Sequence, residues 1–324
     1  MRVLYIGGQG RSGSTLLDRM LGQHDAFFSA GELVHLWARG LTGERCGCGA
    51  AFGDCDFWKE VGQRAFNGWE NVDGAEMVAL QHSVDKTRYV PGMLAPSRLS
   101  PSYAVRRDRY TAMLAKLYRA VSEVGGSKIL IDSSKHPSLA FLLHGMPEID
   151  IRAVLMVRSS HGVAYSWTKE VQKPEVIDGT VLMPQYSPAR SALYWTAYNA
   201  LLQGLERVGV PSVVIQYERL VRTPREELSR VLRLAEQDAG PQALGFISGD
   251  SVSLAPSHTV AGNPMRFKQG DIRLRVDTEW QEKLPRRDAR IVSALSAPLL
   301  GRYGYRLDGT TRVVSANGEP AQSP

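Results

Sequence analysis

The sequence lacks a long hydrophobic run. No stretch of about 18 consecutive apolar residues occurs among its 324 residues, so a membrane-spanning helix is not expected. The apolar stretch 3–6 begins two residues after Met1, which leaves no room for the charged and apolar regions of a secretion signal. We therefore expect a cytoplasmic protein without a membrane span.

Cysteine is also scarce. The only three cysteines, Cys46, Cys48 and Cys55, all lie in "CGCGAAFGDC". A disulfide framework is not expected in a reducing compartment. A zinc site would need a fourth ligand such as His35 or Asp54, and the spacing C-x-C-x6-C is not a strong zinc signature. We favour the interpretation that the three are small hydrophobic residues in a tight loop, and leave metal binding by them open.

The sequence has no block of basic residues with interleaved aromatics, a pattern typical of nucleic-acid-binding segments. Its formal net charge is +6 and its pI is about 9.2, with arginine supplying most of the 39 basic residues. A positive charge spread in this way suits an anionic small-molecule ligand and gives no indication of nucleic acid.

Four short apolar segments predict the core strands of a parallel sheet. They are 3–6, 128–132, 151–157 and 212–216, and a helical pattern follows each of them. The order indicates an α/β fold with helices on both faces of the sheet. We expect one domain over 1–308, with a helical and loop insertion at about 25–127 after the first βα unit, and a disordered tail at 309–324.

Other segments have more local signals. "TPRE" predicts a helix that begins at Thr223, with the Thr223 side chain as cap, Pro224 in the first turn and Glu226 closing a capping box. The remaining expectations are helices near 75–89, 102–124, 189–208 and 285–300, a breaker-rich stretch at 90–102, and a loop or lid at 171–188.

The glycine-rich turn after the first strand fits three phosphate-binding patterns at once. Gly8, Gly10 and Gly13 match the dinucleotide pattern G-x-G-x-x-G. Gly8 to Thr15 match G-x-x-x-x-G-K-[ST], except that Ser14 stands where the lysine belongs. "GRSGST" can also be read alone, as a loop that carries its own cation. All three place backbone amides and a helix N-terminus around an anion.

Two of these interpretations lose support further along the chain. A P-loop kinase or ATPase needs the lysine that Ser14 replaces, and an acidic strand end for magnesium. Of the predicted strands, only 128–132 ends in an aspartate, Asp132, and "SSK" follows it. A dinucleotide site needs an acidic residue at the end of a second strand about 20 positions on, whereas Glu32 lies in a stretch that is typical of a helix start. What remains is a loop for anionic groups that are held without a metal.

A second anion site is indicated at 151–168, "IRAVLMVRSSHGVAYSWT". An apolar strand ends at Arg158, and the helix that follows carries Ser166. Two helical turns and a corner separate these residues, so they could converge on one phosphate. Alone, Arg158 is better explained as a structural ion pair and Ser166 as a small packing residue. Together with the first loop, they favour a ligand with two separate anionic groups.

These two segments together resemble the sulfotransferases that use 3′-phosphoadenosine 5′-phosphosulfate (PAPS), in the branch that includes tyrosylprotein sulfotransferases and bacterial sulfotransferases acting on small molecules and glycans. "GRSGSTLL" is similar to the 5′-phosphosulfate loop of that family, and "LMVRSSHGVAYSW" to its 3′-phosphate motif. The resemblance implies a P-loop-like α/β fold, PAPS as co-substrate and a transfer that needs no metal. It also assigns cofactor contacts, to Gly10, Arg11, Ser12, Gly13, Ser14, Thr15, Arg158 and Ser166.

Four further segments extend the resemblance to about residue 300. "HDAFFSAGEL" places Glu32 at the catalytic base, and the segment after the second predicted strand places Lys135 at a lysine that steadies the transition state. "QYERLVRTP" places Tyr217 at a cofactor-contacting tyrosine. "SHTVAGNPMRF" resembles a loop that closes over the nucleotide, with Ser257 near the reacting group. The contacts implied in that loop are Gly262, Asn263 and Arg266. The family's extra arginine after the motif serine is replaced here by Glu170.

Sulfuryl transfer to a hydroxyl needs a base for the acceptor proton and donors for the charge on the leaving group. The resemblance implies Glu32 as the base, with Arg11, Lys135 and the loop amides as donors and Ser257 assisting. His136 is the rival base, because cytosolic sulfotransferases carry a catalytic histidine in the corresponding region and a histidine titrates near neutral pH.

The acceptor is expected to be a small molecule or glycan with a hydroxyl group. Aromatic residues could line its pocket, although packing in the core is the better explanation for at least half of them; they are Trp37, Trp58, Trp69, Tyr186, Tyr194 and Trp195. The alternatives are a P-loop nucleoside or metabolite kinase and a non-catalytic nucleotide-binding module. The oligomeric state is left open.

Overall fold

A five-stranded parallel sheet forms the centre of the computed structural model, which describes residues 1–324 apart from 96–98, 127–128, 173–181 and 313–324. The order is β2-β3-β1-β4-β5. The strands are β1 (Arg2–Gly7), β2 (Phe27–Ser29), β3 (Ile129–Lys135), β4 (Asp150–Val157) and β5 (Ser212–Gln216). Four of them are the predicted strands, and the α/β fold class is confirmed.

Both faces of the sheet are buried, which explains why the strands are nearly continuous apolar runs. Successive residues of a strand point to opposite faces. Accordingly, Val3 and Tyr5 of β1 belong to one hydrophobic cluster, while Leu4 and Ile6 belong to another. The sheet therefore has two cores, one under each layer of helices.

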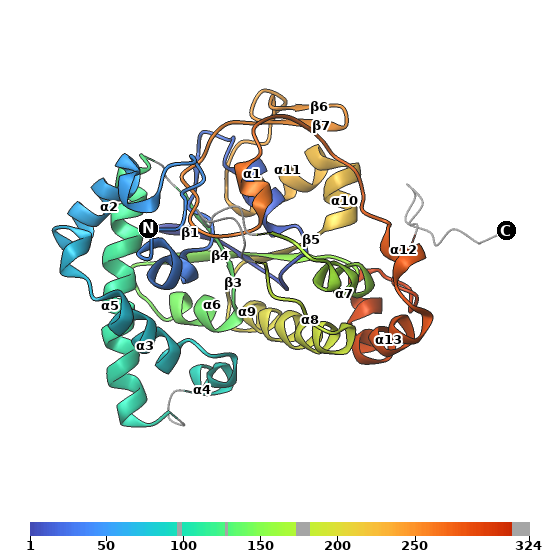
Figure 1. Ribbon diagram of the computed structural model, residues 1–324, viewed down its shortest axis with the longest axis horizontal. Coiled ribbons are helices and arrows are strands. Elements are labelled where there is room, and N and C mark those ends of the chain that lie inside the picture. The colour runs from blue at the N-terminus through green and yellow to red at the C-terminus, as the bar shows by residue number, and fades with distance from the viewer. Residues whose placement is uncertain (96–98, 127–128, 173–181, 313–324) are drawn as a thin grey trace.

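The helices form a layer on each side of the sheet (Figure 1). One layer contains α1 (Ser14–Leu21), α10 (Tyr217–Arg222) and α11 (Pro224–Leu234). The other contains α6 (Pro137–His144), α8 (Pro188–Leu202) and α9 (Gly204–Arg207). Beyond the end of the sheet, α7 (Ser160–Thr168) packs with α8, α12 (Trp280–Lys283) and α13 (Arg286–Leu300).

The insertion between β1–α1 and β3 holds more than helices and loops. It contributes the edge strand β2, which the sequence analysis missed because three residues are too few for a periodic signal. Its helices are α2 (Asp56–Phe66), α3 (Gly74–Val84), α4 (Val90–Met93) and α5 (Pro101–Val124). The breaker-rich stretch at 90–102 thus begins with a short helix. In Figure 1 these helices stand together at one end of the molecule, with the long α5 running across the others.

Near the C-terminus a small antiparallel sheet, also absent from the sequence prediction, is formed by β6 (Ile247–Ser248), β7 (Ser251–Leu254) and β8 (Gly270–Arg273). Residues 309–312, which were assigned to a disordered tail, are ordered, because Tyr305 and Thr311 form an antiparallel bridge. The remainder of that tail, 313–324, and residues 173–181 of the expected lid lie outside the described residues. Where the domain ends stays a prediction.

One local expectation was wrong. Helix α11 begins after Thr223 with Pro224 in its first turn, as predicted, but the Thr223 side chain makes no capping bond. Its hydroxyl instead donates to the carbonyl oxygen of Arg219, 3.2 Å away, because Thr223 also ends the preceding helix α10. Only Thr223 separates α10 from α11, and its hydroxyl bonds to α10 instead of capping α11.

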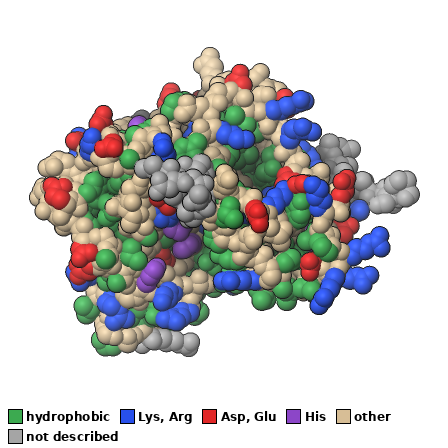
Figure 2. Space-filling view, in the orientation of Figure 1, with side chains coloured by type: hydrophobic (Ala, Val, Ile, Leu, Met, Phe, Trp, Pro, Cys, Tyr) green, Lys and Arg blue, Asp and Glu red, His purple; other side chains and the backbone are tan. Residues whose placement is uncertain are grey.

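No helix in the described ranges is long and apolar enough for a membrane span. On the face shown in Figure 2, acidic side chains are interspersed among the basic ones, so the net positive charge does not form a single-sign stripe there.

Candidate functional site

The predicted anion-binding loop connects the end of β1 to the start of α1. Gly13 has φ of 92° and Arg11 has φ of 72°, a left-handed conformation that glycine adopts without strain. A β-carbon on Gly13 would lie 2.7 Å from the ring of Tyr217, and one on Gly10 would lie 2.7 Å from the ring of Trp167. The loop is glycine-rich because two aromatic rings press against its backbone.

Polar groups in this loop are left available for a ligand. The Ser12 hydroxyl and the Arg11 Nε are buried, and neither has a hydrogen-bond partner among the described residues. Gly13, the cap of α1, contributes no side chain to the first amides of the helix, which begins with Ser14 and Thr15. Buried donors at a helix N-terminus favour an anion, so the residues present fit a phosphate or sulfate group.

Arg158 lies beside this loop, as predicted. Its Nη1 donates to the carbonyl oxygen of Arg11 at 3.3 Å, and its guanidinium lies 4.8 Å from the centre of the Tyr217 ring. The structure therefore brings the two predicted anion-binding motifs together, with Tyr217 against both. Ser166 is half-buried on α7, next to Trp167, whose Nε1 donates to the carbonyl oxygen of Gly10 at 3.1 Å.

Asp277 is a member of the site that the sequence analysis missed. Its Oδ2 lies 3.0 Å from Arg158 Nη2 and 3.9 Å from Lys169 Nζ. Lys169 also pairs with Glu279, whereas Glu170, where the resemblance expects an arginine, is exposed. The ion pair that was considered for Arg158 thus exists alongside its contact with the loop.

Glu32 and Lys135 form a buried ion pair at the carboxyl ends of the strands. Glu32 follows β2 and Lys135 ends β3, so two neighbouring strands deliver them to the same edge of the sheet. Lys135 has φ of 72°, which turns its side chain back so that Nζ also donates to the carbonyl oxygen of Ser133 at 3.2 Å. The Nε2 of His35 lies 3.5 Å from the other Glu32 carboxylate oxygen.

The charges around Glu32 outweigh its burial. Burial alone would raise the pKa of this carboxyl, but the charge of Lys135 holds the pKa below its ordinary value. Burial lowers the pKa of His35 to about 3, so that imidazole is neutral at physiological pH. Arg11 belongs to the same electrostatic environment: burial lowers the pKa of its guanidinium, and the charge of Glu32 partly opposes this. Glu32 is therefore an ionised carboxylate close to the anion-binding loop.

His136, the rival base, lies at the same edge of the sheet. Its ring meets that of His35 edge-on at 5.9 Å, and its Nδ1 lies 3.9 Å from a carboxylate oxygen of Asp85. About a third of its side chain is exposed (35%), against 8% for Glu32. Both candidate bases are thus in place, and the geometry alone does not separate them.

The late loop predicted to close over a nucleotide reaches Glu32 through its backbone. Gly31 and Val260 form a parallel bridge, in which the Glu32 amide donates to the Val260 carbonyl oxygen at 2.8 Å. Gly262 has φ of 119°, and a β-carbon there would lie 3.2 Å from a Glu32 carboxylate oxygen. The loop can approach this carboxylate so closely only because residue 262 is a glycine.

Three other predicted residues of this loop have structural partners. Asn263 accepts from the Met265 amide at 3.1 Å. Arg266 is fully buried and donates to the carbonyl oxygens of Thr259 and Arg45, at 2.7 and 2.6 Å. The Ser257 hydroxyl accepts from Arg19 Nη1 at 3.1 Å. These bonds keep the three side chains occupied with the protein itself, and their predicted roles toward a ligand stay predictions.

Two buried carboxyls accept hydrogen bonds that connect the helices and strands around the site. Asp18 of α1 accepts from the hydroxyls of Ser29 and Ser133, and so ties the loop helix to β2 and β3. Asp132 accepts from the hydroxyls of Tyr118 and Ser134. Burial raises the pKa of each carboxyl to about 6. The sequence signal for Asp132 was its place at a strand end, while Asp18 looked like an ordinary helix residue.

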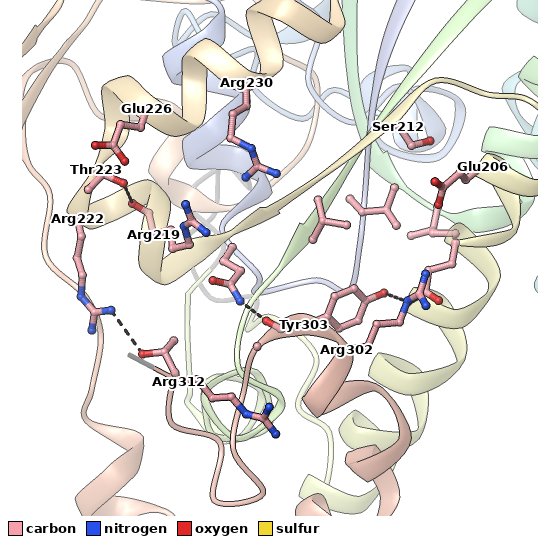
Figure 3. A pocket seen from close by; sticks show the side chains of 17 residues that line it. Glu206, Ser212, Arg219, Arg222, Thr223, Glu226, Arg230, Arg302, Tyr303 and Arg312 are labelled. Carbon is pink, nitrogen blue, oxygen red and sulfur yellow. Dashed lines mark hydrogen bonds between the residues drawn. The ribbon is translucent and has the colours of Figure 1, made fainter. Parts of the chain in front are cut away.

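A separate cavity of about 1160 Å³ lies at the outer edge of β5 (Figure 3). Arginine side chains line it from α10, α11 and the C-terminal segment, and Arg222 and Arg312 are among those that Figure 3 labels. None of the predicted site residues lines this cavity. The predicted anion site therefore lies elsewhere in the structure.

Comparison with solved structures addresses the fold. The sulfotransferase domain from the Synechococcus PCC 7002 olefin synthase aligns with a TM-score of 0.50 and 21% sequence identity, covering 92% of this chain and 94% of that domain. This chain has the sulfotransferase fold. No family model matches it, and no curated protein sequence matches it significantly.

Two further sulfotransferase structures align less well. The domain from the curacin biosynthetic pathway has a TM-score of 0.46 and 19% identity, covering 90% of this chain and 96% of that domain. STF9 from Mycobacterium avium has a TM-score of 0.46 and 14% identity, covering 95% of this chain and 78% of that one. The sulfotransferase fold of this chain agrees with the P-loop-like architecture that the sequence predicted. Its strand order differs from the 3-2-1-4-5-6 order of dinucleotide-binding folds.

Proposed function

We propose that this protein transfers a sulfuryl group from PAPS to a hydroxyl of a small-molecule or glycan acceptor. The observation that carries the proposal is the placement of the buried Glu32–Lys135 pair beside a loop whose Arg11 and Ser12 have unsatisfied donors. A module that only bound a nucleotide would need the loop and Arg158, but not a buried carboxylate and lysine next to them. A kinase would need the lysine that Ser14 replaces.

The residues divide into two groups by what they would hold. Arg11, Ser12 and the N-terminus of α1 would bind the 5′-phosphosulfate end, and Arg158 with Ser166 the 3′-phosphate. PAPS supplies an activated sulfuryl group on a phosphate leaving group. Lys135 would be drawn toward the negative charge of that end, where donors lower the barrier.

Glu32 would take the proton of the acceptor hydroxyl. Its lowered pKa keeps it ionised, but the same ion pair makes it a weak base. As Lys135 moves toward the anionic co-substrate, Glu32 loses its partner and its basicity rises. The ion pair would thus hold the base inactive until the co-substrate binds.

A run of aromatic rings supports the acceptor class. Starting from Trp167, which lies under the Arg11 guanidinium, the rings of Tyr186, Tyr194, Tyr198 and His136 meet in sequence at centre distances of 4.4, 5.8, 6.1 and 6.3 Å. All five side chains are half-buried, so they form a continuous aromatic surface that runs from Arg11 of the anion loop to His136. An aromatic surface of this kind suits binding of a sugar or an aromatic alcohol.

The other candidate aromatics pack inside the protein. Trp37, Trp58 and Trp195 are buried in the hydrophobic clusters, and Trp69 packs against Phe52.

The decisive experiment incubates the purified chain with labelled PAPS and a panel of hydroxylated metabolites and detects transfer by mass. Calorimetry with adenosine 3′,5′-bisphosphate, and heat protection by ATP with magnesium, test the nucleotide separately. Binding of the bisphosphate with sulfated product supports the proposal. Heat protection by ATP with magnesium, without binding of the bisphosphate, would indicate a kinase instead of a sulfotransferase. The Tyr194→Ala variant should raise the KM for the acceptor and leave bisphosphate binding unchanged.

A further inference from the structure

Three cysteines of the insertion lie next to a histidine of the late loop, far away in the sequence. The potential ligand atoms of Cys46, Cys48, Cys55 and His258 all lie within 4.8 Å of one another. We propose that these four side chains form a structural zinc site. This site is separate from the anion loop, and it does not depend on the function proposed above.

The distances match tetrahedral coordination. Zinc binds thiolate sulfur at about 2.3 Å and imidazole nitrogen at about 2.0–2.1 Å, so tetrahedral angles put two sulfurs about 3.8 Å apart and a sulfur and a nitrogen about 3.5 Å apart. Here Cys48 Sγ lies 3.8 Å from Cys55 Sγ. The Nδ1 of His258 lies 3.8 Å from Cys46 Sγ and 3.3 Å from Cys55 Sγ. Sulfurs joined in a disulfide would be about 2.05 Å apart.

The loop that carries the cysteines is built as a tight turn. The Gly49 amide donates to the Cys46 carbonyl oxygen and the Cys46 amide to that of Ala50, both at 2.8 Å, which turns Cys46 and Cys48 toward the same point. Cys55 stands at the start of α2. Gly47 leaves room for the second segment, since a β-carbon there would lie 2.4 Å from Thr259 Oγ1.

His258 is held in a fixed orientation. Its ring stacks on Phe57 at 5.0 Å with an angle of 14°, and its carbonyl oxygen accepts from Trp58 Nε1 at 3.0 Å. Both partners belong to α2, directly after Cys55. The helix that begins after Cys55 therefore orients His258, which lies 203 positions later in the sequence, and the Nδ1 of His258 faces the sulfurs.

The donor set favours zinc in a structural role. Soft thiolate ligands with one imidazole are typical of zinc, and four protein ligands leave no open position for chemistry. Binding would displace one proton from each thiol to solvent and join the metal to three thiolates and a neutral imidazole. Of the two fourth ligands considered from the sequence, His35 lies against Glu32 and Asp54 is exposed.

A metal here would clamp the insertion to the late loop. His258 lies two residues before Val260, whose carbonyl oxygen accepts from the Glu32 amide. Gly47 and Thr259 are joined by a backbone hydrogen bond of 2.9 Å between the same two segments. The proposed zinc would thus hold in place the loop that carries Ser257 and Gly262, at a distance from the anion-binding groups.

Metal analysis of the full chain, purified under reducing conditions without chelator, tests the proposal. We expect about one zinc per chain, and release of that zinc when a mercurial reagent blocks the thiols. After exchange with cobalt, the protein should show the absorption of a tetrahedral cobalt–thiolate site. Stoichiometric zinc with this spectrum supports the site. A chain without zinc whose melting temperature does not respond to added zinc would overturn it, as would a mass two units lower, which indicates a disulfide.

Variants separate the ligand role from simple packing. His258→Ala should lower zinc affinity by more than about 100-fold, because loss of a residue that merely supports a ligand already costs roughly 10–100-fold. Cys48→Ser changes a partly exposed ligand, so the protein should stay folded while its cobalt spectrum loses thiolate intensity. His82→Ala removes an exposed histidine of α3 and should leave metal content unchanged. Unaltered zinc affinity and cobalt spectra in both ligand variants would contradict the assignment.

Discussion

The carboxylate of Asp277 lies 3.0 Å from the guanidinium of Arg158, the residue expected to bind the 3′-phosphate of a nucleotide. Charge-assisted contacts of this kind are among the strongest that a partly buried arginine makes. A phosphate that binds Arg158 must therefore share it with Asp277 or displace this carboxylate.

Replacement of Arg158 tests the 3′-phosphate role. Arg158→Ala should weaken binding of adenosine 3′,5′-bisphosphate by about 10- to 100-fold, the loss expected for charge-assisted hydrogen bonds worth ~1.5–3 kcal/mol. Binding of adenosine 5′-phosphate, which lacks the 3′ group, should change little. Calorimetry measures both constants, and equal losses for the two nucleotides would argue against the assignment.

Asp277→Asn should have the opposite effect. It removes a negative charge from Arg158 and so should tighten bisphosphate binding several-fold by calorimetry. The matched control is Asp250→Asn, which breaks the exposed pair of Asp250 with Arg273 at 2.7 Å. If both variants bind the bisphosphate as the native chain does, Asp277 does not compete with the phosphate.

Glu32→Gln should remove the proposed base while nearly preserving its size. We expect kcat to fall by about 100- to 10,000-fold, the usual contribution of a positioned proton acceptor, with bisphosphate binding nearly unchanged. Glu44→Gln is the control, since Glu44 also pairs with an arginine of the insertion, Arg39, at 2.8 Å. Normal turnover in Glu32→Gln together with its loss in His136→Ala would transfer the role of base to His136.

The pH dependence of kcat/KM distinguishes the same two bases independently. Burial opposes ionisation of Glu32, but the charge of Lys135 lowers its pKa below the ordinary value of 4.5. The acid limb of the profile should therefore lie below that value. An acid limb well above that value would contradict Glu32 as the base.

The buried Asp18 should make stability fall as pH rises. Burial raises its pKa in the folded protein to about 6, from 3.8, so between these values the folded state holds a proton that the unfolded state has released. The slope of unfolding free energy with pH is then negative over that window. Urea unfolding at pH 4 and pH 7 should show Asp18→Asn gaining stability relative to the native chain as pH rises, whereas the exposed Asp56→Asn should follow the native chain. A constant difference between Asp18→Asn and the native chain would refute the shift.

The central strands and the anion loop could be predicted because their signals are local. Residues 3–6 and the glycines that follow fall within one short window, and parallel strands buried on both faces give apolar runs. Glu32, Lys135 and Arg158 were found through a resemblance that also rests on short motifs. In the structure all three lie at the carboxyl ends of strands or just beyond them, and their roles stay predictions.

What could not be predicted depends on contacts between distant parts of the chain. His258 lies next to Cys55 although 203 positions separate them in the sequence, and nothing in its own neighbourhood marks it as a ligand. Asp277 reaches Arg158 in the same way. The strand β2 was missed because its three residues are held by pairing with β3 rather than by their own pattern.

The bridge between Gly31 and Val260 has a consequence for how the protein matures. Every strand of the main sheet emerges from the ribosome before Val260 does, so a nascent chain can assemble its scaffold while Glu32 still lacks the partner of its backbone amide. A chain that ended before this loop would leave the Glu32 amide without its partner, the carbonyl oxygen of Val260.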